Sequence, residues 1–229
     1  LSKNLEFLTN ERISPHGPYT NKVYTLKADK QNVLGVPGAR DISWNNTYTA
    51  AGIYNFTDEK LDNYVKPDIS AFDTLFDFLS VAIHPQNSAH WFVGSFGRGI
   101  IEMNNNTFIK VWNGYNTPIY GTSGNPKDVR VSALEFDNDG NLWVASSYSN
   151  QCVSVRKYDG TWYAYTIPVV TSGDVFSGIT VDNFGNKWLP MPKGGGMLVF
   201  NESGTFQSTI DDKYIRMTTA VGNGNLPSM

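Results

Sequence analysis

The chain has 229 residues, of which 17% are charged and 14% are aromatic, and it contains 21 glycines. This composition favours many short strands and tight turns over helices. The formal net charge of −3 offers no basic surface for nucleic acid, and no apolar run approaches the roughly 18 residues of a membrane span, so we expect neither a nucleic-acid partner nor direct membrane insertion. The single cysteine, Cys152, excludes an internal disulfide.

The first part of the chain changes from a connector into strands. Residues 1–22 show no clear periodicity and include the turn-rich stretch 14–18. Alternating apolar residues then predict strands at 23–26, 32–36, 51–56 and 61–65. Residues 67–79 have apolar side chains at intervals of three and four, which predicts one or two helical turns.

Three further groups of four short strands follow. They are predicted at 81–83, 91–95, 100–103 and 108–112; at 131–136, 142–147, 152–158 and 162–167; and at 177–182, 187–191, 197–200 and 206–210. Long polar or glycine-rich stretches separate the groups. Pro190 cannot donate a ladder hydrogen bond, so the last group should have a bulge or a frayed edge there.

The groups are repeats of one another. Residues 140–143, Gly-Asn-Leu-Trp, return 45 positions later as Gly-Asn-Lys-Trp at 185–188, and in both copies an alternating run begins eleven residues before the tryptophan. The same spacing leads from Ser80 to Trp91. Each of the two Gly-Asn copies predicts a strand, a tight Gly-Asn turn and a second strand headed by the tryptophan, whereas the copy at Ser80 shares the spacing without the turn residues. A second match joins Gly97-Arg98-Gly99 to Gly194-Gly195-Gly196, six residues beyond their tryptophans.

Four units of four short strands, repeated every 40 to 50 residues, are typical of β-propeller blades. We therefore predict an all-β propeller segment with blades at 23–66, 67–116, 117–170 and 171–213. Residues 1–22 are expected to be a connector or a remnant of a preceding blade, and 214–229 a connector into a missing blade. An open arc of four blades would expose large apolar faces at its ends, so we expect it to belong to a seven- or eight-bladed ring.

The sequence offers several apparent sites that a simpler interpretation explains better. The stretch Asp137-Asn138-Asp139-Gly140-Asn141 resembles a calcium loop, but Leu142 and Tyr148 stand where an EF-hand needs glycine and glutamate. His84 and His90 flank a short turn without a third ligand, so we expect structural roles for both. We predict no catalytic residue, no metal site and no cofactor, because the chain contains none of the common nucleophile, phosphate-loop or zinc-hydrolase motifs.

The aromatic residues divide into two groups. Trp91, Trp143 and Trp188 recur at one position of the repeat, which indicates packing between blades. Aromatic residues in the connectors, which we expect to be exposed, are the better candidates for ligand contacts, and we predict this role for Trp44, Tyr48, Tyr115 and Tyr120.

The pattern Asp-x-x-Gly-Asn-x-Trp, followed by Gly-x-Gly and an aromatic-Asn turn, resembles the two-component-regulator propeller repeat of Bacteroidetes proteins over residues 80–229. Within that group, stretches such as 36–39, 54–56 and 90–95 are similar to the surface propeller of the type IX (Por) secretion system. This resemblance implies a non-enzymatic scaffold at the periplasmic side or the cell surface, as part of an exported protein that helps attach secreted cargo at the outer membrane. The implied partners are other secretion-system proteins, surface polysaccharide and the remainder of the same propeller.

Two other functions remain open at this stage. The first alternative is the periplasmic sugar-sensing propeller of a hybrid two-component regulator. The second is a propeller lyase or hydrolase, which would need carboxylates, histidine or tyrosine converging on the central channel.

Overall fold

The computed structural model describes residues 17–57, 60–66 and 68–218. These residues form four antiparallel sheets, each of four strands in sequence order. The first sheet contains β1 (Thr25–Ala28), β2 (Val33–Val36), β3 (Gly52–Thr57) and β4 (Lys60–Val65). The second contains β5 (Phe78–His84), β6 (Asn87–Ser95), β7 (Gly99–Asn104) and β8 (Thr107–Trp112). The third contains β9 (Arg130–Phe136), β10 (Leu142–Ser147), β11 (Val153–Arg156) and β12 (Trp162–Tyr165). The fourth contains β13 (Thr180–Val181), β14 (Lys187–Met191), β15 (Gly196–Asn201) and β16 (Lys213–Met217).

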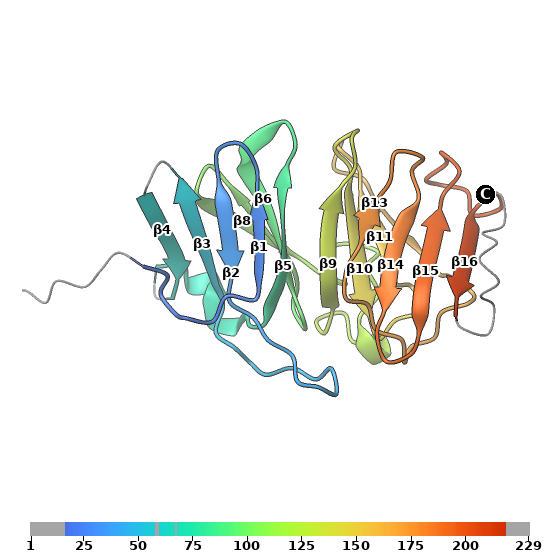
Figure 1. The fold of residues 1–229 in the computed structure, drawn as a ribbon, viewed down its shortest axis with the longest axis horizontal. Helices are drawn as coiled ribbons and strands as arrows, with labels where there is room; N and C mark the ends of the chain where they lie inside the picture. Colours follow the sequence, from blue (N-terminus) through green and yellow to red (C-terminus); the bar gives the residue numbers. More distant parts are fainter. Residues whose placement is uncertain (1–16, 58–59, 67, 219–229) are drawn as a thin grey trace, which may run out of the picture.

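The sheets follow one another like segments of an arc. The first strand of each sheet contacts the first strand of the next, from β1 to β5, β9 and β13. In Figure 1, β4 and β16 lie at opposite ends of the molecule. The predicted all-β architecture of four four-stranded blades is therefore confirmed. Two short 3₁₀ turns interrupt it, η1 (Ser70–Thr74) and η2 (Thr122–Gly124), and η1 lies in the stretch predicted to contain helical turns.

The predicted repeat is also confirmed in the strand register. Trp91, Trp143 and Trp188 each lie in the second strand of their sheet and pair with residues of both the first and the third strand. The glycines of the second match are equivalent as well. Gly99 and Gly196 both have positive φ, and a Cβ on either would lie within 2.1 Å of the backbone carbonyl oxygen of the last residue in the fourth strand of its own sheet, Trp112 or Met217. Only glycine fits this approach without displacing backbone.

Each pair of neighbouring sheets encloses its own apolar layer. Leu34 and Ile53 of the first sheet pack with Trp91 and Val93 of the second. Phe92, between those two residues, points the other way and packs against the third sheet. The inner strands are thus buried on both faces, which explains why five consecutive residues of β6, Trp91–Ser95, and all of β10 are buried. A third layer joins the last two sheets and contains Trp143.

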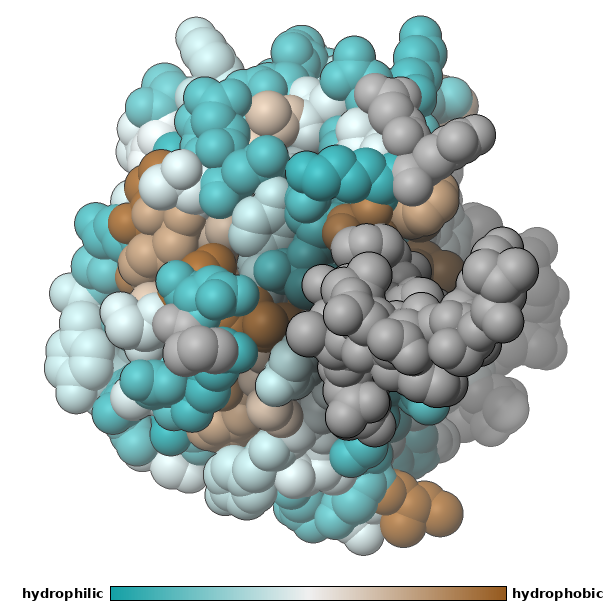
Figure 2. Space-filling view, turned by 90° about the vertical axis from the view of Figure 1, so that its left-hand side faces the viewer, coloured by the Kyte–Doolittle hydropathy of each residue, from teal (hydrophilic) through white to brown (hydrophobic). Residues whose placement is uncertain are grey.

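The outer face of the first sheet is apolar and partly open. Leu26 is 65% exposed, and Val33 and Phe56 are also exposed. These side chains line a shallow groove of about 240 Å³ together with Tyr54 and Leu61. Figure 2, which views the molecule from the β4 side, shows apolar patches on this surface.

The last strand was predicted in the wrong place. Residues 206–210 form part of a loop, and β16 lies at Lys213–Met217, within the stretch expected to begin a connector. Thr205 Oγ1 donates to Asp211 Oδ1 at 2.9 Å and closes this loop, while Phe206 turns inward against Trp143 and Ile210 is 97% exposed. The sequence pattern of residues 206–210 resembles that of a strand and led to the wrong prediction. The rest of the expected connector, 219–229, lies outside the described residues, as does most of 1–22, and the other blade boundaries stay predictions.

Pro190 has the expected effect on the fourth sheet. It pairs with Met197 on the β15 side, where its missing N–H is tolerated, but the β13–β14 ladder contains only two residue pairs. Ser177 N still donates to the Pro190 carbonyl oxygen at 3.1 Å. The predicted frayed edge is therefore the shortened strand β13.

The loop of residues 37–51, between β2 and β3, reaches across several sheets, and we call it the strap. It runs along the lower side of Figure 1, away from the β9–β10 hairpin. Its Trp44 is buried against Leu79, Phe96 and Val175, and Tyr148 packs beside them. Lys193 Nζ donates to the strap carbonyl oxygen of Ser43 at 2.9 Å. One loop of the first sheet thus contacts residues of the other three sheets or their connecting loops.

Candidate functional site: the hairpin pocket

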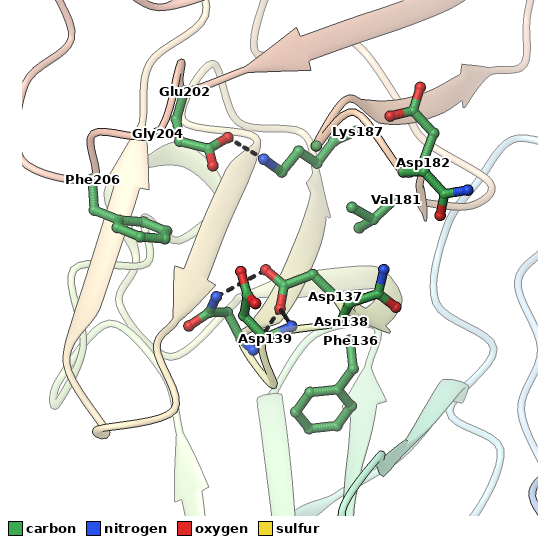
Figure 3. A pocket seen from close by; sticks show the side chains of 13 residues that line it. Phe136, Asp137, Asn138, Asp139, Val181, Asp182, Lys187, Glu202, Gly204 and Phe206 are labelled. Atoms are coloured by element: carbon green, nitrogen blue, oxygen red, sulfur yellow. Dashed lines mark hydrogen bonds and ion pairs between the residues drawn. The ribbon is translucent and has the colours of Figure 1, made fainter.

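Hairpin turns of the third and fourth sheets converge around a pocket of about 300 Å³. We call it the hairpin pocket. It is lined by the turns that follow β9, β13 and β15, and its wall contains four carboxylates and one lysine, namely Asp137, Asp139, Asp182, Glu202 and Lys187. Figure 3 shows Phe206 at one side and Asp182 at the other. A second depression, lined by Lys157 and Tyr158, shares Asp139, Asn141 and Phe206 with the first.

The Gly-Asn-x-Trp motif builds the wall of this pocket. Asp137 directly follows β9, and its carboxylate accepts hydrogen bonds from the backbone N–H groups of Asp139 and Asn141, the Asn141 side-chain amide and the Trp143 indole N–H, all at 2.8 to 3.0 Å. Gly140 has a φ of +81°, which the turn requires. One carboxylate therefore fixes both the turn and the tryptophan, as Figure 3 shows in part.

The fourth sheet repeats this arrangement. Asp182 accepts hydrogen bonds from the backbone N–H groups of Phe184 and Asn186, from the Asn186 side-chain amide and from the Trp188 indole N–H. Burial acts to raise the pKa of Asp182, but the hydrogen bonds from Trp188 and Asn186 outweigh it and hold the pKa below its usual value. In the second sheet, where no equivalent aspartate exists, the Trp91 indole donates to the Ser88 carbonyl oxygen instead.

Lys187 and Glu202 form a buried ion pair at the pocket. Lys187 is 1% exposed, and its ammonium lies 3.6 Å from the centre of the Trp143 ring. Burial lowers the pKa of Lys187, while the hydrogen bond to Glu202 acts in the opposite direction. Leu142 occupies the equivalent position of the third sheet, so the lysine is a departure from the repeat.

Asp212 lies near this pair, and its surroundings destabilise the charged form of its carboxyl group. Burial, followed by the charges of Asp211 and Glu202, raises the pKa of Asp212 to about 6, and Lys187 only partly offsets this. Asp212 Oδ1 is buried without a hydrogen-bond partner among the described residues. Asp212 is thus partly protonated near pH 6.

This arrangement can attract positive charge and form hydrogen bonds, and three of its four carboxylates are already engaged. Asp137 and Asp182 each accept four hydrogen bonds from their own turns, and Glu202 is paired with Lys187. A catalytic carboxylate must reach the proton that it transfers. The charge of the pocket also makes it a poor site for an anionic ligand.

The four aromatic residues predicted as ligand contacts lie on loops at the other end of the sheets. The expectation that Trp44 is exposed was wrong, because its ring is 5% exposed in the core beneath the strap. Arg40 stacks on Trp44 at 3.4 Å. Tyr48, Tyr115 and Tyr120 are 71%, 72% and 52% exposed, so they are accessible, and their ligand role stays a prediction.

His84 and His90 lie together between the second and third sheets. Their rings stack with centroids 5.5 Å apart, and His90 is 2.8 Å from Glu102. Glu102 also accepts the Trp112 indole N–H at 2.7 Å. Within residues 17–57, 60–66 and 68–218, no group of three or more histidine, cysteine or acidic side chains is arranged to hold a metal ion.

Sequence reasoning missed Lys187, Glu202 and Asp77. Lys187 carried a signal, because a lysine replaces leucine inside an otherwise apolar repeat position. The sequence around Asp77 carried no such signal, since the strap residues that donate hydrogen bonds to its carboxylate, Thr47 and Thr49, lie about 30 residues away. In the described part of the chain, no helix is long and apolar enough to cross a membrane.

Comparison with known proteins supports the propeller fold. The two component regulator propeller repeat matches residues 125–148, which include the first Gly-Asn-x-Trp motif. No curated protein sequence matches the chain. The structure is similar to PorZ, described as an essential bacterial surface component of the type-IX secretion system of Porphyromonas gingivalis, with a TM-score of 0.78 and 26% identity. The alignment covers 87% of this chain but only 28% of PorZ.

Two more distant structures share the fold alone. The extracellular domain of a putative hybrid two component system from B. thetaiotaomicron has a TM-score of 0.56 and 13% identity over 90% of this chain and 24% of its own. Virginiamycin B lyase from Staphylococcus aureus has a TM-score of 0.57 and 19% identity over 88% of this chain and 59% of its own. The chain is therefore a propeller segment that carries a two component regulator propeller repeat and is similar to a stretch of PorZ.

Proposed function

We propose that this chain is part of a non-enzymatic β-propeller scaffold in a bacterial surface secretion apparatus, where it takes part in attaching secreted cargo at the outer membrane. The observation that supports this proposal most is the similarity to PorZ, at 26% identity over 87% of the chain. The hairpin pocket agrees with a non-enzymatic role, because three of its four carboxylates are engaged in turns and in an ion pair. The proposed location is the cell surface or the periplasm, and the proposed partners are other proteins of the apparatus and surface polysaccharide.

Deletion of the encoding gene in its host tests this function. We expect secreted cargo to be made in normal amounts but to be lost from the cell surface into the medium, which fractionation and immunoblotting measure. Re-expression of the intact gene should restore surface retention. Unchanged retention in the deletion strain would contradict the scaffold function.

The match of residues 125–148 to the two component regulator propeller repeat favours a second candidate, a periplasmic sugar-sensing domain. This function predicts that deletion leaves cargo retention unchanged and abolishes a transcriptional response to one polysaccharide. RNA sequencing of wild-type and deletion strains, grown on different polysaccharides, separates the two candidates.

We further propose that the apolar outer face of the first sheet packs against another blade of a larger ring. Leu26, Val33 and Phe56 would be covered by such contact, as their counterparts are between the described sheets. Light scattering after size-exclusion chromatography tests this, because the isolated 25.5 kDa chain should self-associate. A compact monomer would count against the larger ring.

A further inference from the structure

Buried hydrogen bonds between Asp77 and the strap, together with strained backbone conformations, hold the exposed Tyr48 in place. Asp77 is fully buried, and its carboxylate accepts hydrogen bonds from the backbone N–H groups of Thr47, Tyr48 and Thr49 at 2.8 to 3.0 Å. The Thr47 hydroxyl donates to it at 2.9 Å. Trp44, Tyr48 and Asp77 all have positive φ, between +49° and +68°. Such backbone strain is concentrated at functional sites.

Beside the strap, Tyr48 forms a small aromatic and cationic surface with Phe76 and Arg98. The Tyr48 ring is 71% exposed and lies against Phe76, with centroids 4.9 Å apart. On the same Phe76 ring, the Arg98 guanidinium lies 4.4 Å from the centroid. Arg98 donates through Nε to the Thr74 carbonyl oxygen and through Nη1 to that of Gly97, so its orientation is fixed. We call Tyr48, Phe76 and Arg98 the strap surface.

The charges around the strap are unbalanced. Among the described residues, Arg98, Arg40 and Lys193 have no carboxylate within ion-pair distance, whereas Asp77 is saturated by strap donors. Hydrogen bonds from the Asn45 backbone and side chain hold the pKa of Asp41 below its usual value and engage its carboxylate. The strap side therefore offers hydrogen-bond donors, positive charge and aromatic faces, but few free acceptors.

These features select one kind of partner. Tyrosine and arginine, held rigidly so that little entropy is lost on binding, are the residue types most enriched at energetic centres of protein interfaces. A carboxylate beside an apolar side chain needs donors and an apolar face, which the strap surface supplies. Sugar hydroxyls require acceptors as well as donors. We propose that the strap surface binds a segment of a partner protein in which a carboxylate neighbours an aromatic or aliphatic side chain.

This proposal specifies a contact surface for the scaffold function, but it is tested by direct binding, so a negative result here leaves the gene-deletion result intact. The probe is a capped peptide of sequence Gly-Glu-Phe-Glu-Leu-Gly, titrated into isotope-labelled protein and followed by NMR. We expect amide shifts concentrated at residues 40–49 and 96–98. A twin peptide with lysine in place of glutamate should not bind there.

Two variants and two controls test the residues. Arg98→Gln and Tyr48→Asn should each weaken peptide binding about tenfold, which corresponds to about 1.4 kcal/mol. Asparagine tolerates the positive φ of position 48, so this variant keeps the strap conformation. The controls Lys30→Gln, in the exposed β1–β2 turn, and Tyr19→Ser, at a tyrosine that is 66% exposed before β1, should bind within about twofold of wild type, since about 0.4 kcal/mol separates such affinities.

The proposal is overturned if the lysine peptide binds equally well, if the shifts lie outside the strap, or if the controls weaken binding as much as the strap variants. A titration with polygalacturonate tests the remaining alternative, that the strap surface binds a glycan. Tighter binding of this anionic polysaccharide to the strap surface, with the same sensitivity to Arg98→Gln, would assign the surface to a glycan and refute a protein partner.

Discussion

Replacement of Asp77 by alanine should release the strap and destabilise the whole chain. The carboxylate accepts three backbone N–H groups, the Thr47 hydroxyl and the Asn46 side-chain amide at 3.3 Å. Hydrogen bonds to a charged group contribute about 1.5–3 kcal/mol each, but water can reach part of the exposed strap in the variant, which reduces the loss. We expect the free energy of unfolding to fall by about 3–5 kcal/mol, a large share of the stability of an ordinary domain.

Urea denaturation followed by tryptophan fluorescence measures this change, since Trp44 lies in the affected region. Asp77→Asn is the matched control. It keeps one acceptor oxygen and tolerates positive φ, so it should cost about 1–2 kcal/mol. A loss below about 1 kcal/mol for Asp77→Ala, or equal losses for the two variants, would show that the carboxylate does not hold the strap.

Three further predictions concern titrating and buried charges. Lys187→Leu should cost about 3 kcal/mol in urea denaturation because it leaves Glu202 buried without a cation, and adding Glu202→Gln should recover most of it; no recovery would mean that the ion pair is not the cause. Burial, followed by the charges of His90 and Arg156, lowers the pKa of His84, so the unfolded state takes up its proton first and stability should decrease as the pH falls below about 6.5, by at most about 1.4 kcal/mol per pH unit. His84→Gln should remove that slope, and an unchanged slope refutes the assignment. The pKa of Asp212 is raised to about 6, so the folded state binds the proton more tightly than the unfolded state and the free energy of unfolding should decrease as the pH rises from 3.8 through 6. Asp212→Asn should therefore stabilise the protein by about 1 kcal/mol at pH 7, after allowance for solvent screening, and have no effect below pH 4. Destabilisation at pH 7 would contradict this.

The repeat was predictable because its signals are local. Gly140 and Asp137 fix a turn within five residues, and the same letters fix the turn at Asp182, so comparison of the copies located the strands. Prediction failed where local alternation competed with a tertiary contact. Phe206 belongs to a strand-like pattern, but it packs against Trp143, and the strand forms later in the chain.

The candidate sites were harder to predict than the fold. Trp44 and Tyr48 lie four residues apart in one connector, and composition gives no reason to treat them differently. Their exposure differs because the strap folds back over the second, third and fourth sheets and buries the Trp44 ring. Asp77 decides which side of the strap faces inward, through hydrogen bonds that join residues about 30 positions apart.

The sequence by itself determined the number of sheets, the number of strands in each and the turn formed by the Gly-Asn-x-Trp motif, because each depends on turns and periodicities shorter than one blade. The tertiary structure alone decided which aromatic side chains are accessible, that Lys187 is buried against Trp143, and that the strap joins four sheets. These features depend on contacts between sheets, where a side chain meets residues that no local pattern relates to it.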